Sequence, residues 1–458
     1  MKAIDDYLVK NHPRAVDELK ELLRIPSVSA DSRHKGDVRK ACQYVADKIK
    51  DAGLKVEILE TGGNPIVLGE WLGAPGAPTV LIYGHYDVQP PDPLELWETG
   101  PFEPTERNGN LYARGSTDDK GQMYLHVKAL EAWMKTAGKL PVNVKILVEG
   151  EEEVGSAAIG EYLATPEAAK RLKCDVAVIS DTSMFAPDIP AITYGLKGIA
   201  YFELFVQGPN RDLHSGSFGG SVQNPCNALG EILAAIKGPD GRIRIPGFYD
   251  DVVEPTPAER DAYRKLPFKD DEYRAELGVR DLFGEAGYTT IERKWVRPTF
   301  DVNGIWGGYQ GEGAKTVLPA KGGAKFSFRL VPNQDPHKIA EALTKFIAEK
   351  APPGITFELK AHHGAGAVVV PLESPYMAAA TKALDVAFGK EPVFIREGGS
   401  IPIVSDFKKR LGVDTILLGF GLPDDNPHSP NEKFRLKDYE RGIRASAHLL
   451  KELAAIRV

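Results

Sequence analysis

The sequence predicts an α/β fold in which a mostly parallel sheet is covered by helices and a smaller α+β domain is inserted. Three observations lead to this prediction. Before about residue 195, stretches of helical period alternate with short apolar runs rich in β-branched residues. From there to about residue 370, alternating patterns such as "IAYFELFVQG" and "GAKFSFRLVPN" predict strands, and helices are expected around 224–237 and 336–350. Beyond residue 370 the helical and strand patterns of the first part return.

The order of these patterns predicts a discontinuous domain of residues 1–194 and 371–458 with an inserted domain of residues 195–370. The chain has 458 residues, and because a typical domain holds about 100 to 200 residues, two or more folded units are expected. The N-terminal stretch "MKAIDDYLVKNHPRAVDELKELLRIPS" spaces apolar residues among acids, which predicts an amphipathic helix. It lacks the basic segment and continuous apolar core of a secretory signal.

Composition and charge argue against several classes of protein. Hydrophobic residues make up 42% and charged residues 26% of the chain, and no apolar stretch is long enough to cross a bilayer. The formal net charge is -7 and the positive charges are scattered, which argues against nucleic acid as a partner. Cys42, Cys174 and Cys226 form no C-x-x-C pair, so neither disulfides nor a zinc knuckle is predicted. We therefore expect a cytoplasmic protein that binds neither membrane nor nucleic acid.

Polar side chains follow four of the expected strands. "TVLIYG" ends at His85, "NVKILVEG" leads to Glu151, "CDVAVIS" leads to Asp181, and "GVDTILLGFG" leads to the loop that carries His428. A further motif, "RGSTDDKG", places Asp118 just before a predicted amphipathic helix. Because ligands of open α/β sheets bind at the carboxyl ends of the strands, we expect these side chains to meet at one edge.

Each motif alone also has a structural explanation. His85 and Asp87 fit an ordinary polar loop, although Asp87 is also placed to hold the imidazole from behind. Asp118 and its neighbours fit a helix N-cap and the acidic first turn that the helix dipole favours. The three glutamates of "EGEEEVGS" fit a solvated acidic loop, Asp181 fits a strand end, and His428 fits a loop between prolines.

Taken together, the motifs favour a metal site. Clustered carboxylates repel one another unless cations compensate their charge, and two histidines among them favour transition-metal ions over calcium or magnesium. Two histidines and three carboxylates can hold two ions if each ion takes one histidine and one terminal carboxylate and both share the third carboxylate. Such a site polarises a carbonyl and generates hydroxide near neutral pH.

The same motifs resemble, in their order and surroundings, those of the M20 family of di-metal exopeptidases. The resemblance is carried by "YGHYDVQP", "RGSTDDKG", "EGEEEVGS", "VISD" and "NPHSPNEKF", together with "RIPSVS", "RDLHSGSFGG" and "EGGSIP". Within the family, the sequence is most similar to the carnosine dipeptidase-like branch of cytosolic non-specific dipeptidases. The likeness extends over nearly the whole chain, although residues 240–300 contain no motif that can be interpreted.

The resemblance implies a role for each metal ligand. His85 and Asp181 would bind one ion, Glu153 and His428 the other, and Asp118 would bridge the two. Because histidine and carboxylate ligands suit several metals, the two ions implied are Zn or Mn, with Co as a third candidate. The resemblance also implies a cis peptide bond between Asp118 and the residue that follows it.

The catalytic residues that the resemblance implies are Glu152, Asp87 and His214. Glu152 would act as general base on the water between the two ions and would return the proton to the leaving amine. Asp87 would orient His85. His214 would enter the active site of the partner subunit from its lid and stabilise the oxyanion, whereas its structural alternative is a turn residue.

A second group of residues is implied to bind the carboxylate end of the substrate. Arg329, a lone cation in the strand "FSFRLVPN", would clamp the carboxylate because its guanidinium fork matches two oxygens. Backbone N–H groups at Gly398, Gly399 and Ser400 would cradle the same carboxylate. The structural alternatives are a surface charge for Arg329 and a plain turn for the glycines.

The sequence therefore predicts a metal-dependent exopeptidase that hydrolyses dipeptides or short peptides with a hydroxide bridging two metal ions. By resemblance it is a homodimer formed through the inserted lid domain. An N-acyl amino acid deacylase with the same metals is an alternative, and an inactive binding or dimerisation module is a second one. The sequence contains no G-x-S-x-G and no H-E-x-x-H motif, which argues against a serine hydrolase of the nucleophile-elbow type and a helix-borne single-zinc protease.

Overall fold

The structure is a computed structural model that describes residues 1–457. It divides into two compact units. Unit 1 contains Met1–Tyr194, Val370–Ile395 and the residues from Ile403 onward, and unit 2 contains Gly195–Val369 and Arg396–Pro402.

The segment Arg396–Pro402 is the main difference from the domain limits that the sequence predicts, because the sequence places it with residues 371–458. Its hydrogen bonds explain why it belongs to unit 2. The Ser400 hydroxyl donates to the Lys197 carbonyl, and the Lys197 N–H donates to the Glu397 carbonyl. These bonds connect residues that are about 200 positions apart, which no local sequence pattern reveals.

A nine-stranded sheet, most of it in unit 1, has the strand order β1-β2-β6-β3-β7-β17-β8-β15, with β16 also paired to β8. The four central strands β6, β3, β7 and β17 run parallel. They correspond to the four strands predicted to end in polar residues, and the predicted parallel sheet is confirmed at its centre. The outer pairs β1–β2, β2–β6, β17–β8 and β8–β15 are antiparallel. The strands are β1 (Lys55–Leu59), β2 (Ile66–Trp71), β3 (Thr79–His85), β6 (Asn143–Glu149), β7 (Val176–Ile179), β8 (Ala191–Leu196), β15 (Val368–Val369), β16 (Val393–Glu397) and β17 (Thr415–Leu417).

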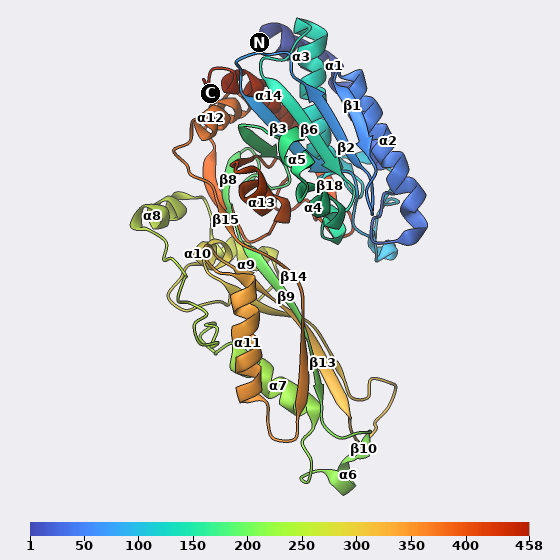
Figure 1. Ribbon diagram of the computed structural model, residues 1–458, viewed down its shortest axis with the longest axis vertical. Helices are drawn as coiled ribbons and strands as arrows, with labels where there is room; N and C mark the ends of the chain where they lie inside the picture. Colours follow the sequence, from blue (N-terminus) through green and yellow to red (C-terminus); the bar gives the residue numbers. More distant parts are fainter. Residues whose placement is uncertain (458) are drawn as a thin grey trace. The chain divides into compact units, whose positions relative to one another are not determined.

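Helices flank this sheet (Figure 1). Because both faces are covered, nearly every residue of β3, β6 and β7 is buried, which explains their continuous apolar sequences. The predicted N-terminal amphipathic helix is α1, and it packs on α3, which also contacts α14 and β3. The helices of this part are α1 (Lys2–Leu23), α2 (Lys35–Asp51), α3 (Lys120–Ala137), α4 (Ala157–Leu163), α5 (Pro166–Arg171), α12 (Pro375–Phe388), α13 (Pro402–Asp406) and α14 (Leu436–Leu453).

A small sheet of unit 1 connects two loops that are distant in sequence. Its strands are β4 (Thr105–Arg107), β5 (Asn110–Tyr112) and β18 (Lys433–Arg435), in the order β18-β5-β4. Phe434 of β18 pairs with Leu111 of β5. This pairing places the loop before β18, which carries His428, beside the loop after β5, which carries Asp118.

Unit 2 contains a four-stranded antiparallel sheet in the order β11-β13-β9-β14. Helices α7 and α11 pack along one face of it (Figure 1), and both agree closely with the helices predicted near 224–237 and 336–350. Residues of β9 therefore alternate between buried and half-buried. The main elements are β9 (Gly198–Gln207), β11 (Thr299–Gly307), β13 (Lys321–Leu330), β14 (Thr356–Ala365), α7 (Pro225–Ile236) and α11 (Pro336–Lys350).

The core of unit 2 is rich in aromatic side chains. Phe202, Phe300, Phe326 and Phe328 are all buried, and the ring centroids of Phe300 and Phe328 lie 5.1 Å apart. Truncating one such phenylalanine to alanine typically costs about 3 to 5 kcal/mol, because the surrounding core collapses only partly into the cavity. The tightly packed core therefore keeps this sheet rigid and holds the residues at its strand ends in fixed positions.

Residues 240–300, which lack interpretable motifs, contain three short helices of unit 2: α8 (Pro257–Lys265), α9 (Asp270–Glu276) and α10 (Thr290–Trp295). Another short part of unit 2 consists of β10 (Leu213–His214), α6 (Ser215–Phe218) and β12 (Val317–Leu318). The three cysteines are free thiols. Over the described residues, no helix combines the length and the apolar character needed to span a membrane.

Candidate active site

The carboxyl ends of the central strands of unit 1 gather the predicted metal ligands. His85 is the last residue of β3, Asp181 follows β7, and Glu153 follows β6 in a short 3₁₀ turn. His428 lies in the loop after β17, and Asp118 lies just before α3. The structure therefore brings together all five residues at the edge where open α/β sheets bind their ligands.

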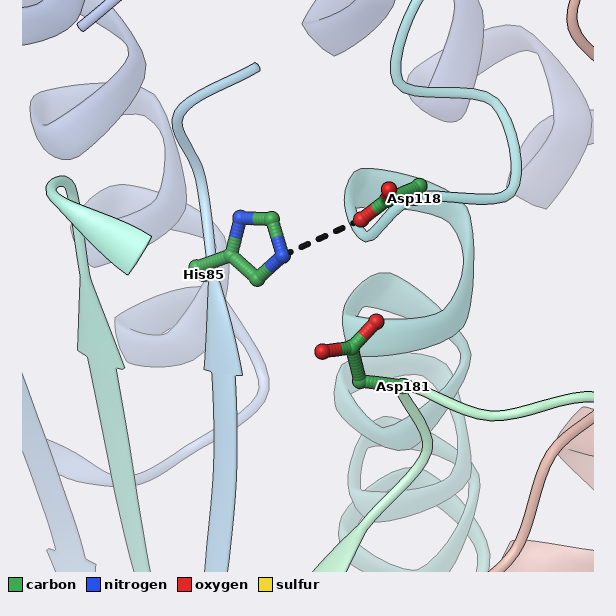
Figure 2. A group of neighbouring side chains, drawn as sticks. All are labelled: His85, Asp118 and Asp181. Carbon is green, nitrogen blue, oxygen red and sulfur yellow. Dashed lines mark ion pairs between the residues drawn. The ribbon is translucent and has the colours of Figure 1, made fainter. Parts of the chain in front are cut away.

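The first candidate metal site consists of His85, Asp118 and Asp181. One ligand atom from each lies within 4.8 Å of the others, and Figure 2 shows the three side chains turned toward a common centre. His85 Nε2 lies 3.3 Å from Asp118 Oδ1. On the other side of the ring, Nδ1 lies 3.1 Å from the Asp87 carbonyl and 3.3 Å from Asp87 Oδ1. These acceptors favour a proton on Nδ1, which would leave the Nε2 lone pair to a metal ion.

The second candidate site consists of Asp118, Glu153 and His428, whose ligand atoms also lie within 4.8 Å of one another. His428 Nε2 lies 2.9 Å from Asp118 Oδ2 and 3.3 Å from Glu153 Oε2. Asp118 thus offers one oxygen to each site. The structure groups the ligands in the two sets that the resemblance implies, with Asp118 common to both. The peptide bond after Asp118 is cis, as the resemblance also implies.

Residues behind the ligands hold them in place. Asp87 is completely buried, and its Oδ2 accepts a hydrogen bond of 3.2 Å from the Glu153 N–H while its Oδ1 faces His85. It therefore connects one ligand of each site. Gly84 precedes His85 because a Cβ there would lie 2.7 Å from Met123 Cβ and 2.8 Å from Asp119 Oδ2. The start of α3 can approach β3 only when this position has no side chain.

The electrostatics of the two sites show that they suit cations. Burial, followed by the charge of Asp118, raises the pKa of Asp181 well above its usual range. Hydrogen bonds with Asp118 and Glu153 raise the pKa of His428 to about 10. Burial opposes charge on His85, but hydrogen bonds with Asp118 and Asp87 outweigh it and raise the pKa of His85. All three shifts favour a bound proton, because the clustered carboxylates are stabilised by positive charge. A divalent transition-metal ion would supply that charge, and it is well suited to imidazole and carboxylate donors.

Glu152 differs from its neighbour Glu153. It belongs to neither candidate metal site. Within the described part of the chain, its carboxylate forms no hydrogen bond or ion pair. Burial raises the pKa of Glu152 to about 7; the charge of His85 opposes this, whereas that of Glu153 adds to it. A carboxylate that is close to the ligands but not held by them retains free lone pairs, which a general base requires.

His214 of unit 2 has a fixed tautomer. Its Nδ1 accepts hydrogen bonds of 3.1 Å from the Gly216 N–H and 3.2 Å from the Ser217 N–H. Because Nδ1 is an acceptor in both bonds, the proton of the neutral ring is on Nε2. His214 is exposed, so its Nε2–H is available as a hydrogen-bond donor.

Arg329 lies near the end of β13 in unit 2. Its Nη1 donates a hydrogen bond of 3.1 Å to Ser400 Oγ, and the Ser400 hydroxyl donates in turn to the Lys197 carbonyl. Gly399 is exposed, with open space around its Cα. Among the described residues, no carboxylate lies within 4 Å of Arg329 or of the Lys197 ammonium. Lys197 is almost completely buried, and its ammonium donates a hydrogen bond to the Arg293 carbonyl. Two cations without a paired anion make this a candidate site for a carboxylate.

Residues 81–452 match the model of the family described as "Peptidase family M20/M25/M40". The chain belongs to this family. Its M20 relatives include the "Cys-Gly metallodipeptidase dug1" of Schizosaccharomyces pombe, which is 36% identical, with 98% of each chain covered.

Solved structures of M20 proteins are similar over their full length. Human carnosine dipeptidase 1 has a TM-score of 0.88 and 31% identity, with 99% of each chain covered. The "M20 family metallo-carboxypeptidase Sso-CP2 from Sulfolobus solfataricus" has a TM-score of 0.87 and 34% identity, covering 96% of this chain and 99% of that one. These likenesses confirm the predicted fold and the predicted place in the carnosine dipeptidase-like branch of the M20 family.

Two residues near the candidate sites of this M20 protein escaped the sequence interpretation. Glu432 belongs to the motif "NPHSPNEKF" and is wholly buried beside the Asp118 loop. Its position in the motif was a signal that could have pointed to it, because only the histidine of this motif, His428, had been assigned a function. Lys197 lies in the otherwise apolar stretch "YGLKGIAYF". A lysine between two strands of buried residues was a comparable signal, since lysine is seldom fully buried without a partner.

Proposed function

We propose that the protein is a metal-dependent dipeptidase that hydrolyses dipeptides or short peptides. The observation that supports this best is the pair of ligand sets that share Asp118, with the unligated Glu152 beside them. The dipeptidase activities named for the S. pombe and human relatives support the choice of substrate. All five ligand positions carry metal-binding residue types, which disfavours an inactive binding module.

His85, Asp118 and Asp181 would hold one divalent ion, and Asp118, Glu153 and His428 the other. Zn or Mn fits these donors, with Co as a third candidate. When bound, two such ions would supply Lewis acidity that polarises a carbonyl and makes a bound water molecule a stronger nucleophile. Asp87 keeps the His85 ring oriented, and through the Glu153 N–H it keeps the two ligand sets in a fixed relation.

Glu152 is the proposed general base. Its free carboxylate takes a proton from the attacking water and passes it to the nitrogen of the leaving amine, so that one residue serves both proton transfers. Glu153, one residue later in the 3₁₀ turn, faces His428 instead. Adjacent side chains in such a turn point about 120° apart, which explains how neighbouring glutamates take separate roles.

His214 is the proposed donor to the oxyanion, through the Nε2–H that its hydrogen bonds leave free. We propose further that it acts on the partner subunit of a homodimer formed through unit 2, which would serve as the lid. An exposed strand edge supports this assembly. β11 is at the edge of its sheet, and its Val302 and Ile305 are 40% and 63% exposed. Such an edge favours pairing with another chain.

Arg329, Ser400 and the backbone at Gly399 are the proposed binding site for the substrate carboxylate. The unpaired charges of Arg329 and Lys197 support the assignment, because an anion would compensate both. Burial lowers the pKa of Arg329 below its usual range. A bound carboxylate would offset that cost, and the guanidinium fork would fix its orientation. A cytoplasmic location remains a prediction from the cysteine pattern.

The proposal is tested by removing metal ions with a chelator and then measuring hydrolysis before and after Zn²⁺ or Mn²⁺ is restored. The substrates are free dipeptides, the same dipeptides with an acylated N-terminus, and tripeptides. Metal-restored cleavage of the free dipeptides alone supports a dipeptidase and ranks the metals. Preference for acylated substrates would instead indicate a deacylase. Release of the last residue from tripeptides would indicate a carboxypeptidase like the Sulfolobus relative, and no cleavage with any metal would indicate a binding module.

A further inference from the structure

Glu432 connects the two loops that carry Asp118 and His428. It is four residues after His428, and its side chain is wholly buried. Oε1 accepts hydrogen bonds of 2.9 Å from the Thr117 N–H and 3.0 Å from the Asp118 N–H. Oε2 accepts bonds of 2.8 Å from the Gly115 N–H and 2.7 Å from Arg114 Nη1. The backbone takes part as well, since the Glu432 carbonyl accepts from the Ala113 N–H.

This arrangement uses the full capacity of an ionised carboxylate. Two carboxylate oxygens offer about four lone-pair sites, and four donors occupy them. Three of the donors are consecutive or nearly consecutive backbone N–H groups that end at Asp118 itself. A glutamine would turn an NH₂ group toward two of the donors, and a leucine would leave all four without an acceptor.

The contacts of Glu432 determine where Asp118 can point. Asp118 places Oδ1 3.3 Å from His85 and Oδ2 2.9 Å from His428. Both distances depend on the position of the Asp118 backbone, and Glu432 fixes that backbone relative to the chain segment that bears His428. The fourth donor, Arg114, is itself buried and is paired with Glu432, so the group cannot move toward solvent without leaving a buried charge alone.

We propose that Glu432 is a positioning residue of the two-metal centre: it holds the shared carboxylate of Asp118 between the two histidines and thereby sets the affinity for both ions. The inference depends on the metal centre and not on the identity of the substrate. Partners that orient metal ligands typically contribute 10- to 100-fold to metal affinity. We expect a loss of that size when Glu432 loses its second acceptor oxygen.

The test is a titration of the metal-stripped full chain with Mn²⁺, using competition with a fluorescent chelator. Glu432→Gln is expected to weaken Mn²⁺ binding about 10- to 100-fold. It should also change the magnetic coupling between two Mn²⁺ ions in the electron paramagnetic resonance spectrum, because a shared carboxylate is one of the bridges that carry this coupling. Glu432→Asp retains both oxygens and should recover part of the affinity and of the coupling.

Glu285→Gln is the matched control. Glu285 of unit 2 is a buried carboxylate that accepts hydrogen bonds from Arg297 Nε at 2.8 Å and from Arg297 Nη2 at 2.9 Å. Its loss removes a comparable buried ion pair from a region without metal ligands. It should lower the unfolding temperature yet leave Mn²⁺ affinity unchanged.

Three results would overturn the proposal. The first is a folded Glu432→Gln chain with the affinity and coupling of the parent. The second is an equal loss of affinity in Glu285→Gln, since affinity would then follow stability alone. The third is failure of both Glu432 variants to fold, which would assign Glu432 to the fold itself. If only Glu432→Gln fails to fold, Glu432→Asp decides: weaker binding with normal folding supports the proposal, and parental binding refutes it. Because the readout is Mn²⁺ binding, it does not depend on whether dipeptides are cleaved.

Discussion

Replacing Lys197 by methionine should make unit 2 more stable at neutral pH. The ammonium is almost completely buried and donates a hydrogen bond of 2.9 Å to the Arg293 carbonyl. Burial, followed by the charge of Arg329, lowers the pKa of Lys197 to about 7 from its ordinary value of 10.5. Methionine has a similar length and no charge, so Lys197→Met removes the cost of burying an ammonium.

The size of the effect follows from proton linkage. A lowered pKa means that the unfolded chain binds the Lys197 proton more tightly than the folded chain does, so the protein loses stability as pH falls from about 10.5 to about 7. Each pKa unit corresponds to about 1.4 kcal/mol, which gives about 4 to 5 kcal/mol at pH 7. Loss of the hydrogen bond to Arg293 costs about 1 kcal/mol in the opposite direction. Lys197→Met should therefore be about 3 kcal/mol more stable than the parent at pH 7, and the two chains should be about equally stable near pH 10, where the linkage contribution has fallen to about 1 kcal/mol.

Urea unfolding of the metal-free chain, followed by tryptophan fluorescence at pH 7, 8.5 and 10, measures this difference. Lys325→Met is the matched control, since Lys325 is an exposed lysine on β13 of the same sheet, and its stability relative to the parent should not change over this pH range. If the difference between Lys197→Met and the parent does not change with pH, the pKa of Lys197 is the same in the folded and the unfolded chain, and burial does not penalise its charge. A parent that is more stable at pH 7 would refute the reasoning outright.

Three further predictions concern the reaction. Glu152→Gln should lower kcat about 10²- to 10⁴-fold with metal content preserved, because a general base contributes about that much; loss of both ions, measured by metal analysis, would make Glu152 a ligand instead. His214→Ala should lower kcat about 10²- to 10³-fold with little change in KM, as for an oxyanion donor, and an unchanged kcat in steady-state assays would remove His214 from the mechanism. Arg329→Lys should raise KM for dipeptides about 10-fold or more through loss of the fork. It should leave C-terminally amidated dipeptides nearly unaffected, and equal effects on both substrates would argue against a carboxylate clamp.

The edge of the parallel sheet was predictable because two kinds of signal coincided there. Buried strands have continuous apolar sequences, and a polar residue directly after such a run must lie at a strand end. His85 and Asp181 were found in this way, and the topology rule for α/β sheets placed them together. The pairing of β5 with β18 brings the Asp118 and His428 loops together across more than 300 residues. The topology rule predicted a common edge for both loops, and only the resemblance implied that both residues bind the same ion.

The three glutamates after β6 show where sequence patterns stop being informative. Glu151 accepts hydrogen bonds of 2.6 Å from the Asn64 N–H and 3.0 Å from the Ala158 N–H, so it stabilises the loop. The Glu152 carboxylate has no hydrogen-bond partner among the residues that the structure describes, and Glu153 faces His428. Three identical residues in a row have identical local signals. Their roles differ because successive residues of the 3₁₀ turn point in different directions and so meet different neighbouring groups. Those neighbours depend on the tertiary structure.

Burial is the other property that the sequence does not express. Glu432 and Lys197 are charged residues in short motifs, and their local sequence marks them as unusual without showing that they are buried. Their importance follows from the absence of water around them, since a charge moved out of water must find partners or lose stability. Glu432 has four hydrogen-bond donors. Lys197 has one carbonyl, which is why the two residues lead to opposite expectations for stability.

The two units carry uncompensated charge of opposite sign. In unit 1, burial and the neighbouring charge of Asp118 raise the pKa of Asp181, which is the expected state of carboxylates that lack a cation. In unit 2, burial lowers the pKa values of Lys197 and Arg329, and the charge of Asp301 offsets this only in part. A ligand that binds only the folded state stabilises it in proportion to the logarithm of its concentration. Divalent cations should therefore stabilise unit 1, and small carboxylates should stabilise unit 2. Each unit is thus less stable without its ligand than it would be with uncharged residues at the same positions.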